Sequence, residues 1–116
     1  MSKLTLFRDA APPDTEHVPA RITAGAPVTR YRVVAGGEDG RLSAGIWQAT
    51  PGAWRVSYTE WEYCYIVAGR AVLTEDGEAP IAIGPGDGLT LAPGFTGIWQ
   101  VSETMTKHFV ILDPPA

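Results

Sequence analysis

Between Thr29 and Leu112 the chain alternates short runs of apolar and polar residues with turns rich in glycine, proline and aspartate. Successive side chains of a β-strand point to opposite faces, so this alternation predicts strands with one buried face. The pattern gives roughly eight or nine strands, separated by turn signals about every 8–12 residues. The predicted strands are 29–34, 41–49, 53–59, 63–68, 71–74, 81–83, 89–91, 98–102 and 107–112.

Gly69 and Arg70 predict a tight connection between two of these strands, and no segment predicts a helix of any length. Sheets must protect their exposed edge strands, and closed or double-sheet forms do so. The sequence therefore predicts an all-β domain, either a sandwich, a barrel or a jelly roll.

Residues 1–28 have a different composition, rich in proline and alanine. Proline fixes the backbone and lacks an N–H group, so no helical pattern survives in this segment. We expect an extended arm at 1–28, lying over the domain or over a partner subunit, followed by one domain at 29–116. A disordered tail is the alternative for the first dozen residues.

Composition and charge narrow the class of protein. Hydrophobic residues make up 45% and charged residues 19% of the 116, as in folded globular domains. The net charge is −4 without any basic run, so neither nucleic acid nor an anionic membrane is an expected partner. No apolar run approaches the roughly 20 residues of a membrane span, and no signal peptide is evident. We expect a cytoplasmic protein, although a secreted protein without a leader would share this pattern.

Two turn-rich segments, 51–69 and 86–99, carry a family resemblance. The first is similar to cupin motif one, in which Glu62 and Gly69 keep the final spacing. The second resembles cupin motif two, a Gly-Asp turn, a strand and a Pro/Gly turn, with its proline and glycine displaced by one position. The resemblance implies a single-domain, RmlC-like cupin jelly roll, a barrel also described as a double-stranded β-helix.

A narrower resemblance covers about residues 41–112 and is to the ureidoglycine aminohydrolase-type cupins, which include many small single-domain proteins. It implies small, nitrogen-rich substrates. The matching residues are Gly45-Ile46-Trp47, Pro51-Gly52, Tyr58-Thr59-Glu60-Trp61-Glu62, Cys64, Gly69-Arg70, Gly86-Asp87, Gly94-Phe95-Thr96-Gly97-Ile98-Trp99 and Lys107.

The resemblance also implies where a cupin metal would be bound, by three histidines and the glutamate equivalent to Glu62. Counted from that glutamate, the histidine positions fall at Val56 and Tyr58, or at Arg55 and Ser57, and at Gly97. None of these residues is a preferred ligand of zinc, iron or nickel. The chain has only two histidines, His17 and His108, so we expect no transition metal and no cofactor.

A carboxylate surrounded by aromatic residues remains as candidate chemistry. Glu62 shares a strand face with Cys64 and Ile66. It is the candidate catalytic residue, for proton transfer or as a ligand anchor. The alternative is a buried hydrogen-bond partner of a tyrosine or arginine. The candidate ligand-binding residues are Tyr58, Glu60, Cys64, Trp47 and Trp99.

Several of these residues have a purely structural alternative. The four tryptophans, Trp47, Trp54, Trp61 and Trp99, can stack on a planar ligand, but such residues are more often core or interface residues. Cys64 is a candidate nucleophile or a small buried hydrophobe. Tyr65 faces away from Glu62, which indicates packing or a dimer contact. Lys107 and His108 alternate on the last strand, so one faces inward unless the strand is a solvated edge.

Three hypotheses of function follow, in order of preference. The first is a metal-free module that binds a small polar or aromatic metabolite in the barrel. The second is a metal-independent isomerase or hydrolase of small nitrogen-rich metabolites that uses Glu62. The third is an accessory or structural subunit that forms a homodimer.

Overall fold

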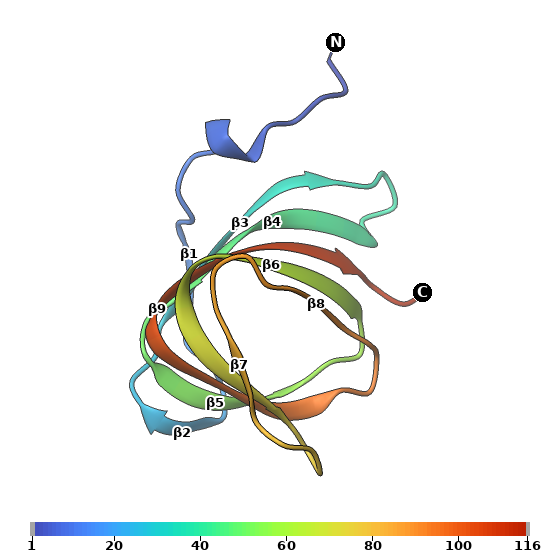
Figure 1. The fold of residues 1–116 in the computed structure, drawn as a ribbon. Coiled ribbons are helices and arrows are strands. Elements are labelled where there is room, and N and C mark those ends of the chain that lie inside the picture. Colours follow the sequence, from blue (N-terminus) through green and yellow to red (C-terminus); the bar gives the residue numbers. More distant parts are fainter. Residues whose placement is uncertain (1, 116) are drawn as a thin grey trace.

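The computed structural model describes residues 2–115 of the chain and is almost entirely β-structure, as the sequence predicts (Figure 1). A 3-10 helix of three residues, η1 (Phe7–Asp9), precedes the strands. The described residues form nine strands, β1 (Thr15–His17), β2 (Ile22–Gly25), β3 (Thr29–Gly36), β4 (Leu42–Ala49), β5 (Gly52–Ser57), β6 (Trp61–Glu75), β7 (Ile81–Ile83), β8 (Gly88–Leu91) and β9 (Thr96–Leu112). Within 2–115, no helix is both long and apolar enough to cross a membrane.

All nine strands belong to one antiparallel sheet that curls around a central space, as Figure 1 shows. Along one path the strand order is β1-β3-β4-β9-β5-β2, while β6 pairs with β7, β8 and β9. The long strand β9 makes the curl, because one half pairs with β4 and the other with β5. The opposite edge of β9 pairs with β6, from Trp61 opposite Leu112 at one end to Glu75 opposite Gly97 at the other.

The turn predicted at Gly69-Arg70 is wrong, because β6 passes through it without ending. The pairing of β6 with β9 instead shifts register between Ile66 and Ala71, as at β-bulges, where an extra residue bends a strand that continues. Gly69 has φ +89° and faces the backbone of Thr104, so a side chain there would meet that carbonyl oxygen. The last two predicted strands are likewise one strand, β9.

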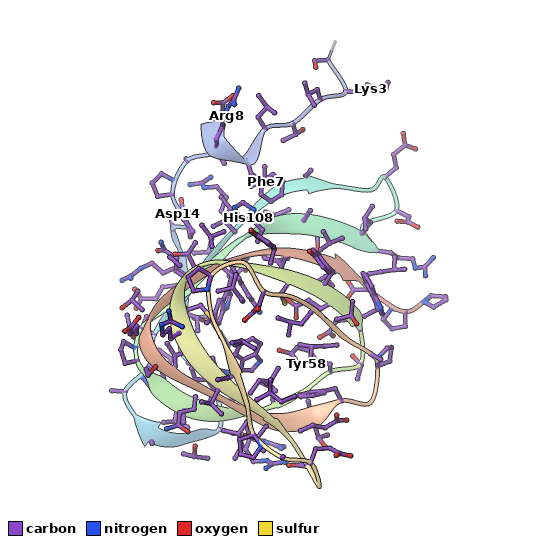
Figure 2. The ribbon with its side chains drawn as sticks, in the orientation of Figure 1. Lys3, Phe7, Arg8, Asp14, Tyr58 and His108 are labelled. Atoms are coloured by element: carbon purple, nitrogen blue, oxygen red, sulfur yellow. The ribbon has the colours of Figure 1, made fainter. Side chains whose placement is uncertain are left out.

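Residues of the N-terminal segment extend this sheet at two places. β1 pairs with β3 and β2 pairs with β5. The hydroxyl of Thr29 donates a hydrogen bond to the carbonyl oxygen of His17 at 2.8 Å, which fixes β1 against β3. Before β1 the chain runs outside the curl, where the Phe7 ring packs on His108 at 4.8 Å between centroids (Figures 1 and 2).

The inner face of the curl carries the core. In the first half of β6 every second residue is buried, starting at Glu62 and continuing with Cys64 and Ile66. Trp99 and Met105 of β9 are among the largest fully buried side chains. Two charged residues share this apolar face, Glu62 and Lys107, each only 4% exposed. Buried charges are rare unless they are paired, so this part of the core is the candidate functional site.

Candidate functional site

A cavity of about 470 Å³ opens on the inner face of the sheet. That volume falls within the range of about 300–1,000 Å³ typical of small-molecule sites. Its walls include side chains from β4, β5, β6 and β9 and from the loop after β5. Among them are Trp47, Trp54, Tyr58, Glu62, Trp99 and Lys107.

Lys107 and Glu62 form an ion pair in this cavity. The amine Nζ of Lys107 lies 3.3 Å from Oε2 of Glu62, and the two side chains are 4% and 5% exposed. Lys107 stands on β9 opposite Ile66, whereas Glu62 stands on β6 opposite Ile111. Both side chains are buried on the inner face. Because the two residues are offset along the paired strands, their side chains extend toward each other along the strand direction. A pair so deeply buried needs good geometry to offset the cost of desolvating both charges.

Two indole rings flank the same ammonium. Nζ of Lys107 lies 4.3 Å from the Trp47 ring centroid and 4.7 Å from that of Trp99. Trp47 is the cross-strand partner of Lys107 on β4, so the strand register brings them together. Each cation–π contact contributes about 0.5–2 kcal/mol, with the larger values at desolvated sites. The ammonium is thus held by a carboxylate and two aromatic faces.

Lys107 keeps its positive charge despite its burial. Burial by itself lowers the pKa of the amine, but Cys64, Glu62 and Tyr58 raise it, and the net pKa of Lys107 is above its usual value. Of these groups, Glu62 has an oxygen 3.3 Å from the amine, and this contact favours the charged form of Lys107. An amine held in this state is a hydrogen-bond donor and a cation, not a free nucleophile.

Tyr58 completes the wall beside Trp99. The Nε1–H of Trp99 donates a hydrogen bond to the Tyr58 hydroxyl oxygen at 3.0 Å. The backbone of Tyr58 exchanges hydrogen bonds with the turn at 94–95, which holds the ring inside the curl (Figure 2). Burial raises the pKa of Tyr58 to about 12, with Lys107 lowering it and Glu62 raising it less strongly. The phenol is therefore neutral at neutral pH and can still donate its proton to a ligand.

Cys64 lies two residues beyond Glu62 and is completely buried. Burial raises the pKa of its thiol to about 12, against the opposing effect of Lys107 and with a further rise from Glu62. A thiol in this state carries almost no thiolate at neutral pH, and the thiolate is the nucleophile. These observations favour the small buried hydrophobe over the nucleophile.

Five of the six residues expected at the site from sequence line the cavity: Tyr58, Glu60, Glu62, Trp47 and Trp99. Cys64 is buried on the same strand face but behind that lining. Trp54 also lines the cavity, whereas Trp61 lies on the outward face of β6 and is 37% exposed. Tyr65 is outward as well, and its role in a homodimer stays a prediction.

The central residue that sequence reasoning did not select is Lys107. The available signal was an inward row on β9, Met105, Lys107, Phe109 and Ile111, in which one lysine interrupts apolar residues. A charged residue at an inward position of a strand requires a buried partner. Sequence alone offers several acidic residues for that role, and only the register between β6 and β9 selects Glu62.

The residues of the cavity do not fit a cupin metal. Gly97 of β9 pairs with Glu75 of β6, and a side chain at Gly97 would meet the carbonyl oxygen of Thr74. Within residues 2–115, no cluster of three or more histidine, cysteine, aspartate or glutamate side chains could hold a metal ion. The buried carboxylate of Glu62 already pairs with a cation, Lys107, whose charge would repel a metal ion.

Comparison with known families gives a match over residues 36–109 to the model of the EutQ-like cupin domain. A search of curated proteins found no match. Among solved structures, one similar chain is a protein of unknown function of the DUF861 family from Pseudomonas syringae pv. tomato. It has a TM-score of 0.77 and 21% identity, over 90% of this chain and 45% of that one. The chain thus spans less than half the length of that relative.

Two further structures agree with this fold. The EutQ protein of Clostridium difficile has a TM-score of 0.66 and 16% identity, over 75% of this chain and 69% of that chain. A DUF861 family protein from Thermotoga maritima has a TM-score of 0.53 and 30% identity, over 55% of this chain and 73% of that chain. The predicted cupin fold is confirmed, whereas the narrower ureidoglycine aminohydrolase-type resemblance is not decided by these matches.

Proposed function

The chain belongs to the EutQ-like cupin domain family, and on that premise we propose that its cavity binds a small, planar, polar metabolite without the help of a metal. Function cannot be taken from a fold that serves many chemistries, so the proposal depends on the cavity itself. Its size and mixed apolar and polar walls are typical of sites for small molecules.

The observation that carries the proposal is the ion pair of Lys107 and Glu62 between two indole rings. The partly exposed ring of Trp47 offers a flat apolar surface on which a planar molecule can stack, and the buried Trp99 ring supports the wall behind it. The pair offers a donor and an acceptor side by side, which fix the orientation of a bound molecule. Apolar residues of similar volume often stabilise a core as well as a buried ion pair does, so stability alone does not account for this pair.

A thermal-shift panel of planar polar metabolites, with nitrogen-rich compounds included because of the ureidoglycine aminohydrolase-type resemblance, tests the proposal. A true ligand raises the melting temperature, since ligand at 100 times its Kd stabilises the fold by about 2.7 kcal/mol. The Trp47→Ala variant should lose the shift. The matched control is Trp61→Ala, which removes the same side chain from the outward face and should keep it. No hit across the panel, or equal shifts in both variants, would overturn the proposal.

A second candidate function is metal-independent isomerisation. It is favoured by the 3.3 Å separation of a permanent donor and a carboxylate that open on one cavity. Glu62 would remove a proton from carbon next to a substrate carbonyl, while the Lys107 ammonium donates a hydrogen bond to the oxygen that gains the negative charge. Return of the proton to a different atom completes the reaction, with no other reactant.

Deuterium exchange into a bound carbonyl compound, followed by NMR, tests this step directly. Wild-type protein should exchange the hydrogen beside the carbonyl, and Glu62→Gln should abolish the exchange. If both proteins bind the compound and neither exchanges its hydrogen, the protein is a binding module and the isomerase is excluded.

A further inference from the structure

Building on the proposed binding function, we infer that the ligand is electrically neutral and presents a carboxamide-type edge, with an N–H donor beside a carbonyl oxygen, to Glu62 and Lys107. The inference depends on the charge balance of the cavity and on the chemistry of the two groups at its base.

The charges that line the cavity are already balanced where they are buried. Lys107 and Glu62 neutralise each other at 3.3 Å, both almost inaccessible to solvent. Arg55 also lines the cavity, but its guanidinium lies 2.6 Å from Asp76, with both side chains partly exposed. Glu60 adds one negative charge in the loop after β5. The described lining therefore offers no unbalanced cation at the base of the cavity.

An anionic ligand meets two obstacles at this base. Its carboxylate or phosphate would compete with Glu62 for one ammonium, and two anions would then share one cation in a place with little water. Glu60 adds repulsion at the loop. A cationic ligand meets the converse obstacle, because it would compete with Lys107 for the one buried carboxylate. In both cases the ligand charge loses its hydration without a free partner.

A neutral carboxamide-type edge avoids both obstacles. Its carbonyl oxygen can accept a hydrogen bond from the Lys107 ammonium, which carries three donors, and its N–H can donate to the Glu62 carboxylate, which accepts several bonds. Hydrogen bonds to charged groups are about twice as strong as those between neutral groups. The flat amide and an attached ring also suit the space beside Trp47 and Trp99.

Three probes of the same size separate these possibilities: benzamide, benzoate and benzamidine, which are neutral, anionic and cationic near neutral pH. Calorimetry or NMR titration of wild-type protein should show benzamide binding at least about tenfold more tightly than either charged analogue. Tighter or equal binding of benzoate or benzamidine overturns the inference. No binding of any of the three at millimolar concentration overturns it as well.

Variants of the pair then test the stated cause. In Glu62→Gln the base carries an unpaired ammonium, so the preference should move to benzoate. In Lys107→Met it carries an unpaired carboxylate, and the preference should move to benzamidine. An unchanged ranking in a folded variant contradicts the charge-balance argument. If either variant unfolds, the wild-type ranking alone decides.

The outcomes also separate this inference from the proposed function. A charged ligand found by thermal shift and lost in Trp47→Ala would leave the binding function standing and remove the neutral carboxamide class. A panel without any ligand would remove both.

Discussion

The Lys107 amine lies 3.3 Å from the Glu62 carboxylate in a part of the core where each side chain is at most 5% exposed. The two residues come from β9 and β6 and meet only because these long strands pair. Burial makes their mutual dependence strong, since removal of one partner leaves the other charge without compensation.

We predict that Lys107→Met destabilises the fold by about 3–5 kcal/mol, because it leaves the buried carboxylate of Glu62 without a partner. Glu62→Leu alone should have a cost of similar size. The double variant should return close to the wild-type free energy of unfolding, since no charge then remains. Urea denaturation of the four proteins measures the coupling. Additive losses in the double variant would show that the two residues act independently.

The stability of the fold should fall at alkaline pH. The folded pKa values of Cys64 and Tyr58, each about 12, exceed their usual values of 9.0 and 10.0. Their contribution to stability is therefore complete below about pH 9 and is lost as the pH rises through 12. Each group lowers the free energy of unfolding by up to about 1.4 kcal/mol for every pH unit between its usual and its folded pKa. Lys107, whose pKa is also raised, adds to the loss above its usual 10.5.

Unfolding free energies measured from pH 8 to pH 11 check this dependence. Tyr58→Phe should flatten the curve only above about pH 10, and Cys64→Ala should flatten it from about pH 9. At pH 8, where the phenol is protonated in both states, Tyr58→Phe should lower stability by about 1–3 kcal/mol, because the Trp99 N–H loses its acceptor. Identical slopes in wild type and both variants would contradict the role of burial.

The Cys64 thiol should resist alkylation until the chain unfolds. Its pKa of about 12 against 9.0 reduces the thiolate fraction about a thousandfold at pH 8, before access is considered. Iodoacetamide labelling, followed by mass spectrometry in buffer and in denaturant, gives the two rates. Fast labelling of folded protein would show that the thiol is accessible and reactive, and would restore it as a candidate nucleophile.

A histidine at Gly97 should not restore a cupin metal site. The β-carbon of any side chain there meets the Thr74 carbonyl oxygen, so Gly97→Ala should cost about 3 kcal/mol. The control is Gly37→Ala, where the nearest atom is the Leu42 Cβ at 3.3 Å in an exposed turn. Denaturation measures both costs, and metal analysis of Gly97→His after incubation with zinc tests loading. Stoichiometric zinc in a stable variant would contradict the prediction.

The sequence by itself determined the all-β class and the shared strand face of Glu62 and Cys64, because local alternation is visible in a chain without folding. The missing histidine ligands were implied by the resemblance to the cupins. Glycine at position 69 was also visible, but a glycine marks a turn and a bulge equally well. Only the register of β6 against β9 decided between them.

The tertiary structure decided the partner of Lys107. An inward lysine needs a buried carboxylate, but strand pairing selects which residues meet, and pairing depends on contacts far apart in sequence. The pairing of β4 with β9 places Trp47 opposite Lys107, and two further pairings join β1 to β3 and β2 to β5. Local alternation specifies which way a side chain faces, and long-range pairing specifies what it meets there.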